Sequence, residues 1–279
     1  MTFKAGLVQM RSGRDMQRNL LDASALIREA ADKGARYIQT PEVTNVFEQD
    51  KDYLKKIALA ERDDPVARGL AALAGELGVY LHVGSLALKG ESGKLVNRAL
   101  LFGPDGAKIT HYDKVHLFDI DLANGDSYRE SATYDPGDSA TVAQLPFCAL
   151  GFAICYDVRF PRLFNALANG GATVIAIPAA FTVPTGEAHW HVLQRARAIE
   201  TGSYVLSAAQ GGMHEAGKAT YGHSLAISPW GEILAEGGTA PCVLVVDVDP
   251  AQAIEARSRI PALNNAREFS LKTVPGVAS

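Results

Sequence analysis

Three short segments of the chain, each beginning where an apolar run ends, carry side chains that together could cleave an amide bond. Cys155 follows the apolar run 152–154, Glu42 follows the short apolar segment 37–39, and Lys114 lies in a polar stretch. A strand that delivers a thiol to its own end presents a nucleophile instead of hiding it. A thiol, a carboxylate and an ammonium group therefore suggest one site assembled from three distant parts of the chain.

Each of these residues also has an ordinary interpretation. A cysteine in an apolar segment is usually a small buried hydrophobe, and Lys114 alone fits a surface charge. Glu42 comes directly after Pro41, so it could be a solvated carboxylate in a turn that ends a strand. The combination favours catalysis, because a cysteine amidohydrolase needs a nucleophile, a base and a cation.

Composition narrows the class of protein. The 279 residues are 47% hydrophobic and 21% charged, with a net charge of −4 and no long run of either sign. This balance does not indicate a nucleic-acid or membrane-surface partner. Cys148, Cys155 and Cys242 cannot all pair and form no CxxC motif, which suits a reducing compartment. With neither a signal-peptide pattern nor an apolar stretch of about 20 residues, the sequence predicts a cytoplasmic protein.

Strands alternate with amphipathic helices along both halves of the chain. Asp15 and Gly34 are suited to begin and end the first helix, and Gly78 to end the second. Two similar halves predict an α/β fold in which two sheets pack together under outer helices, a four-layer α-β-β-α sandwich. The expected strands are 3–9, 37–39, 79–88, 99–102, 150–154, 173–177, 204–209, 225–228, 233–235 and 243–248, and the expected helices are 15–34, 65–77, 162–168, 187–200 and 251–259.

The sequence shows no linker between the halves, so residues 1–260 are expected to form one domain. The remaining segment, 261–279, is polar and sparsely apolar. Such a tail is either frayed or packed on a neighbouring subunit.

Seven short segments have the order and spacing of one known family; they are 41–42, 112–118, 151–161, 186–190, 195–200, 222–224 and 229–231. Together they resemble the nitrilase superfamily of carbon–nitrogen hydrolases, and the resemblance runs from Lys4 to about Arg259. It implies the α-β-β-α sandwich and assembly into homodimers or larger homo-oligomers.

The resemblance implies that Glu42 is the general base, Cys155 the nucleophile and Lys114 the cation that stabilises the oxyanion. Glu130 falls where many members carry a second glutamate. These roles agree with the chemistry, because a thiol that is mostly protonated at pH 7 needs a base. The Tyr156 backbone N–H would assist Lys114 at the oxyanion. A second carboxylate is expected to raise the pKa of Glu42.

The branch of the family determines the expected substrate. True nitrilases carry Trp-Glu after the cysteine, whereas this chain has Tyr156 and Asp157, which resembles the omega-amidases and deaminated-glutathione amidases. Arg159 could grip a substrate carboxylate through two hydrogen bonds, or it could pair with Asp157. Phe181 and Thr185 are candidate pocket walls. The expected reaction converts the amide of a small acid to the free acid and ammonia through a thioester; N-carbamoyl or aliphatic amides are the alternative.

Two other classes of function fit part of this residue pattern. A papain-like hydrolase would pair Cys155 with His189 or His223, but Glu42 and Lys114 would then have no role. A catalytically silent binding protein on the same fold would have no reason to carry the thiol, the carboxylate and the ammonium group together.

Cofactor and metal motifs are weak in this sequence. The run 212–218 matches the start of a phosphate-binding loop, but Ala219 follows where that loop needs a magnesium ligand. His189 and His191 stand two apart in a helical segment and face different ways. The other histidines are scattered, so neither a metal site nor a cofactor is expected.

Overall fold

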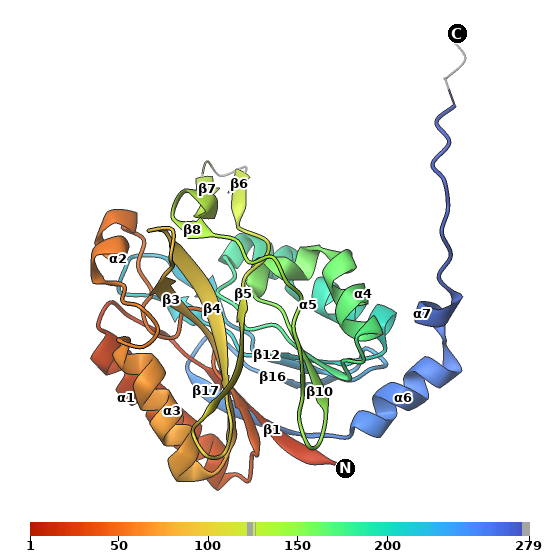
Figure 1. Cartoon of the computed structure of the whole chain (residues 1–279), viewed down its shortest axis with the longest axis horizontal. Coiled ribbons are helices and arrows are strands. Elements are labelled where there is room, and N and C mark those ends of the chain that lie inside the picture. Colours follow the sequence, from red (N-terminus) through yellow and green to blue (C-terminus); the bar gives the residue numbers. More distant parts are fainter. Residues whose placement is uncertain (122–124, 126, 275–279) are drawn as a thin grey trace.

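The first of two large sheets contains strands from both ends of the chain (Figure 1). The computed structural model describes residues 1–121, 125 and 127–274. The strand order is β17-β1-β2-β3-β4-β5, with β1, β2 and β3 parallel and the other neighbours antiparallel. The strands are β1 (Phe3–Gln9), β2 (Tyr37–Gln39), β3 (Tyr80–Lys89), β4 (Leu95–Phe102), β5 (Lys108–Asp113) and β17 (Cys242–Val248), and β8 (Tyr134–Asp135) pairs with β4.

The second large sheet repeats this plan, with the order β16-β15-β12-β11-β10-β9 and a parallel centre of β10, β11 and β12. Its strands are β9 (Val142–Gln144), β10 (Ala149–Phe152), β11 (Val174–Ala176), β12 (Tyr204–Ser207), β15 (Leu225–Ile227) and β16 (Ile233–Glu236). The two halves of the chain therefore build similar sheets, as the alternating pattern predicts.

Side-chain alternation along β1 shows how the layers form. Leu7 packs in a core shared with Leu150 and Phe152 of the second sheet, while Val8 packs with Ile27 on the helical side. Successive residues of a strand point to opposite faces, so the two sheets meet face to face. Outside them lie α1 (Met16–Asp32) and α3 (Pro65–Leu77) on one side and α4 (Pro161–Asn169) and α5 (Val183–Thr201) on the other. The predicted α-β-β-α sandwich is confirmed.

Glycines bring a helix close to each sheet. A Cβ added at Gly6 would lie 3.0 Å from the Cβ of Ala30, and one at Gly151 would lie 3.3 Å from the Cβ of Leu167. Both contacts are tighter than ordinary van der Waals packing, so the absence of a side chain lets the helices sit against the strands.

The helix signals in the sequence act as predicted. The Asp15 carboxylate accepts hydrogen bonds from the first turn of α1, and α3 begins with Pro65 and ends at Gly78 with φ of 64°. Helix α5 begins at Val183, earlier than the expected 187, because Pro184 is tolerated in a first turn. The short elements that the sequence pattern misses include β8, β9, α2 (Lys51–Ile57), β6 (Asp119–Asp121), β7 (Ser127–Arg129), β13 (Gly211–Met213), β14 (Ala219–Tyr221) and the C-terminal α7 (Ala262–Asn265).

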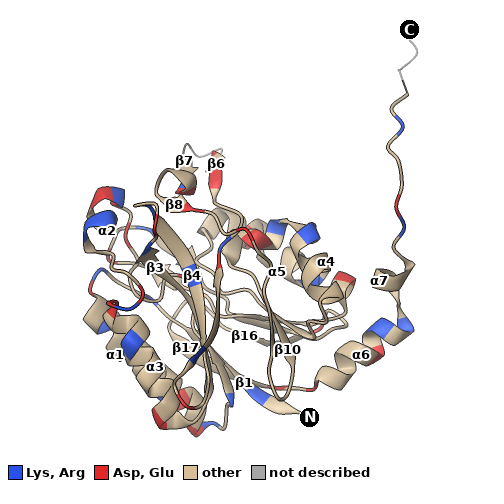
Figure 2. Cartoon of the chain, viewed as in Figure 1, with Lys and Arg blue, Asp and Glu red and all other residues tan. Residues whose placement is uncertain are grey.

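The segment that follows the last helix leaves the body of the molecule. Helices α6 (Pro250–Arg259) and α7 (Ala262–Asn265) lead into an exposed, extended segment that projects away from the sheets (Figure 1). Figure 2 shows both charge signs along α2, α3 and α6. Among the described residues, no helix combines the length and apolar character needed to cross a membrane.

Candidate active site

A buried ammonium group joins two carboxylates at one end of the sandwich. Lys114 Nζ lies 2.9 Å from Glu42 Oε1 and 2.9 Å from Glu130 Oε2, and only 3% of the Lys114 side chain is exposed. Lys114 follows β5, Glu42 lies just past β2, and Glu130 opens a short 3-10 turn, Glu130–Ala132. The structure thus brings together three of the predicted residues from three segments.

Cys155 lies at a sharp bend after β10. Its φ is 49°, its N–H donates to Pro178 O at 2.9 Å, and burial together with the charge of the nearby Glu42 carboxylate raises the pKa of its thiol. Positive φ is strained for a residue with a side chain and is found mainly where the surrounding structure enforces it. Val43, next to Glu42, has φ of 50°. Both the thiol and its neighbouring carboxylate are therefore presented on enforced turns.

Further hydrogen bonds fix the two carboxylates. Asn97 Nδ2 donates to Glu42 Oε1 at 2.9 Å and to Glu130 Oε1 at 3.3 Å, while Ala180 N–H donates to Glu42 Oε2 at 2.8 Å. Phe118 N–H donates to Glu130 Oε2 at 2.6 Å. Sequence reasoning missed Asn97; the available signal was an amide next to Arg98 in the otherwise apolar strand β4.

Protonation states follow from burial and from these charges. Burial raises the pKa of Glu42, but the Lys114 charge and hydrogen bonds from Lys114, Cys155 and Asn97 outweigh it and leave the pKa lowered. Burial lowers the pKa of Lys114, but the carboxylates of Glu130 and Glu42 raise it well above its usual range. Burial and the Glu42 charge raise the pKa of the Cys155 thiol. The resting site holds a neutral thiol beside an ionised carboxylate.

This result corrects the expectation of a raised pKa at Glu42. That expectation counted the charge of Glu130 but not the position of the ammonium group. Lys114 lies in contact with both carboxylates, so the opposite charge at 2.9 Å prevails over the like charge.

Asp157 supports the bend that carries the nucleophile. It is fully buried, and it accepts hydrogen bonds from Ile154 N–H at 2.8 Å, from Tyr112 Oη at 2.7 Å and from His116 N–H at 3.0 Å. The expected alternative role of Arg159, pairing with Asp157, is wrong, because these partners occupy the carboxylate. Asp157 ties the bend after β10 to the segment that follows β5.

Arg159 instead lies against aromatic rings. Its guanidinium carbon is 5.6 Å from the Phe181 ring centre and 5.9 Å from that of Tyr156, and Nη2 lies 3.3 Å from His189 Nδ1. Arginine over an aromatic face gains an electrostatic attraction that keeps the cation in place.

A cavity of about 330 Å³ opens onto the buried cluster. Cys155, Glu42, Lys114 and Glu130 line it, and so do the predicted wall residues, which are Tyr156, Phe181 and Thr185. Arg159 is not among the lining residues but packs behind two of them. Three cations that sequence reasoning missed also line the cavity, namely Lys51, Arg129 and Lys218.

The histidines of the Cys-His alternative lie elsewhere. His189 contacts Arg159, and His223 hydrogen-bonds Glu236. Neither of the two lines the cavity that holds Cys155. Glu42 and Lys114 are the charged side chains that act on the Cys155 thiol in the described site, which favours Glu42 as the base.

Known proteins resemble this chain over most of its length. The family model described as carbon-nitrogen hydrolase matches residues 4–258. The omega-amidase NIT2 of Bos taurus is 37% identical over 269 residues, covering 95% of each chain. The deaminated glutathione amidase of Yersinia enterocolitica is 39% identical over 267 residues, covering 95% of this chain and 93% of that one. Nit3 of Saccharomyces cerevisiae, a member of branch 10 of the nitrilase superfamily, superposes with a TM-score of 0.84 at 29% identity, covering 93% and 94%.

Proposed function

The chain belongs to the carbon–nitrogen hydrolase family, and from that premise we propose that it hydrolyses the amide of a small carboxylate-bearing molecule with Cys155 as nucleophile. It is an amidohydrolase of linear amides. The observation that carries the proposal is the cavity that Cys155 shares with the buried cluster in which Lys114 bridges Glu42 and Glu130.

In the first step, Glu42 takes the thiol proton as sulfur attacks the amide carbon. The lowered pKa of Glu42 keeps it ionised at neutral pH and able to accept this proton. The carbonyl oxygen becomes an oxyanion, which the Lys114 ammonium and the Tyr156 N–H stabilise. The proton on Glu42 then goes to the leaving nitrogen, ammonia departs, and Cys155 remains as a thioester.

In the second step, water hydrolyses the thioester. Glu42 or Glu130 takes one proton from the water as its oxygen attacks the thioester carbon. The sulfur leaves as thiolate and receives that proton, so the products are the free acid and the original thiol. The balance is one amide and one water in, one acid and one ammonia out, without a redox step.

Positive charge around the cavity supports an acidic substrate. Lys51, Arg129 and Lys218 line the cavity, and Arg159 packs on its aromatic wall. A hydrogen bond from a charged donor to a carboxylate is stronger than one from a neutral donor. The names of the relatives, omega-amidase and deaminated glutathione amidase, agree with such a substrate. We propose Tyr156, Phe181 and Thr185, which line the cavity, and Arg159, which packs behind Tyr156 and Phe181, as substrate-binding residues.

A panel of compounds tests this proposal. Purified protein is incubated with 2-oxoglutaramate, a neutral amide of similar size, an N-carbamoyl amino acid and an aliphatic nitrile, and released ammonia is measured. Deaminated glutathione is followed through its acid product, because its leaving group is an amine. We expect the acidic amides to give the highest kcat/KM. Preference for the neutral amide or the N-carbamoyl compound would contradict the proposed substrate class.

We also propose a cytoplasmic homo-oligomer in which residues 1–260 form one domain and the tail 261–279 packs on a neighbouring copy; positions 275–279 of this tail lie outside the described residues. The tail carries exposed apolar side chains, Phe269 and Leu271, each about 90% exposed. Ile199, Trp230 and Ile260 are more than half exposed and line a second cavity of about 260 Å³. Light scattering on the full chain and on a chain ending at 260 tests this. If both forms contain the same number of chains per particle, docking of the tail would be contradicted.

A further inference from the structure

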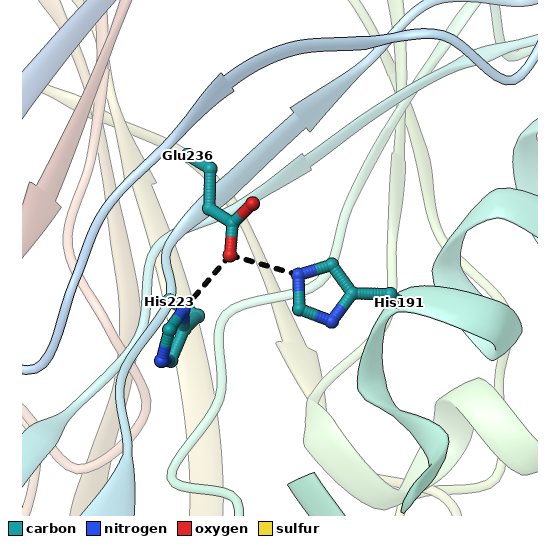
Figure 3. A group of neighbouring side chains, drawn as sticks. All are labelled: His191, His223 and Glu236. Carbon is teal, nitrogen blue, oxygen red and sulfur yellow. Dashed lines mark hydrogen bonds and ion pairs between the residues drawn. The ribbon is translucent and has the colours of Figure 1, made fainter. Parts of the chain in front are cut away.

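Two histidines and a glutamate converge on the surface away from the catalytic cluster (Figure 3). His191 lies on α5, His223 lies between β14 and β15, and Glu236 ends β16. His191 Nε2 is 2.9 Å and His223 Nδ1 is 2.8 Å from the same oxygen, Glu236 Oε1. None of the three lines the cavity that holds Cys155.

The geometry suits a small divalent ion. One donor atom from each residue lies within 4.8 Å of the others. Zinc binds imidazole nitrogen and carboxylate oxygen at about 2.0–2.2 Å in a tetrahedron, which places donor atoms about 3.3 Å apart. The two histidine–glutamate separations would open by about 0.5 Å and the imidazoles would approach one another. Rotation of exposed side chains allows movements of this size.

The donors are fixed on rigid backbone yet accessible to solvent. The His223 carbonyl accepts from Trp190 Nε1 at 2.8 Å, and its N–H donates to Gly238 O at 2.8 Å. The Tyr221 ring stacks on the His223 ring at 4.3 Å. The side chains of His191, His223 and Glu236 are 30%, 26% and 34% exposed, so an ion can enter and water can complete its coordination.

The carboxylate is suited to a cation as well. Its Oε1 is the oxygen on which the two imidazole nitrogens converge. Two imidazoles and one carboxylate form a ligand set that zinc and related transition metals favour over magnesium or calcium.

We propose that His191, His223 and Glu236 form a binding site for a divalent transition-metal ion of the zinc class, separate from the catalytic cavity. The ion would join α5, the β14–β15 connection and β16, which backbone and side-chain hydrogen bonds also link here. The site does not take part in amide hydrolysis. Its existence is therefore independent of the proposed function.

Zinc chloride alone is the probe. The Cys155→Ala chain, without a histidine tag, is treated with a chelator, dialysed and titrated with zinc by calorimetry; the alanine prevents binding to the reactive thiol. We expect one ion per chain. At 100 times the dissociation constant, the melting temperature should rise by about 5–10 °C. If zinc does not bind even at millimolar concentration, the proposal is overturned, and the three side chains form only a hydrogen-bonded cluster.

Three variants assign the ligands. His191→Gln, Glu236→Gln and His223→Asn should each weaken zinc binding by at least about 100-fold, since even partners behind the ligands contribute 10- to 100-fold. Asparagine is chosen for His223 because the backbone there has φ of 54°. His111→Gln, an exposed histidine on β5, is the matched control and should bind as the parent does. Equal affinity in all variants would refute the assignment, and a cobalt spectrum with thiolate character would place the ion on a cysteine.

Discussion

Replacing Lys114 with methionine separates the structural and the chemical role of the buried ammonium group. Lys114 contacts Glu42 and Glu130 at 2.9 Å each, with 3% of its side chain exposed. Methionine fills a similar volume but leaves both carboxylates buried without their cation. Breaking a buried ion pair costs about 3–5 kcal/mol. For a chain of about this size, each kcal/mol changes the melting temperature by about 2–4 °C, so a fall of about 6–20 °C is expected.

Catalysis should fail more completely than folding. The variant lacks the cation at the oxyanion, and loss of one such donor costs about 10²–10³ in kcat. The double variant Lys114→Met with Glu130→Gln removes one of the two buried carboxylates that have lost their cation. It should recover part of the lost melting temperature and none of the activity, because the oxyanion still lacks its cation.

The stability difference should also depend on pH. Because the pKa of Glu42 is lowered in the folded parent, its contribution is present above the ordinary carboxyl pKa of 4.5 and is lost as pH falls through the lower folded value. Without Lys114 this contribution disappears. The gap in melting temperature between parent and variant should therefore narrow in acid.

Calorimetric melting at several pH values and single-turnover amide hydrolysis measure both effects. Lys114→Arg is the matched control, because it keeps the charge and changes the shape. A Lys114→Met chain as stable as the parent would refute the buried-pair reasoning. One that hydrolyses amides at the parent rate would remove Lys114 from the mechanism.

Three further predictions concern single residues. Cys155→Ala should lose at least about 10⁴-fold in kcat with little change in melting temperature. In the parent chain, iodoacetamide should alkylate Cys155 before Cys148 and Cys242, which peptide mass spectrometry would detect. Arg159→Ala should lower kcat/KM for an acidic amide by about 10- to 150-fold and for a neutral amide little; equal losses would make Arg159 structural. Fully buried His82 has its pKa lowered by burial from 6.5 to about 3, so stability should fall as pH drops below 6.5, by about 2 kcal/mol at pH 5. A His82→Gln chain that loses as much stability as the parent between pH 7.5 and pH 5 would contradict this.

The layers of the fold and the identity of the clustered residues were predictable from the sequence. Apolar runs that end in polar residues identify strands and the ends where side chains emerge. That pattern predicted β1, β2 and β10 together with Glu42, Lys114 and Cys155. Each of these signals is local, so it survives without knowledge of the rest of the chain.

Features that depend on distant neighbours were not predictable. The position of Lys114 between two carboxylates reverses the expected pKa shift of Glu42, and only the folded geometry gives that position. Asn97 reads as one polar residue in a strand until its contacts with Glu42 and Glu130 are known. His191 and His223 are separated by 31 residues of sequence, so their spacing predicts no metal site.

The partner of β1 has a consequence for how the chain folds during synthesis. Strand β17, near the C-terminal end, forms the edge of the first sheet and pairs along all of β1, from Phe3 opposite Val248 to Gln9 opposite Cys242. Until Val248 has left the ribosome, the hydrogen-bonding edge of β1 is open. An open strand edge is a template for pairing with other chains. A nascent chain stalled before Val248 should therefore associate with other chains more readily than one stalled beyond it.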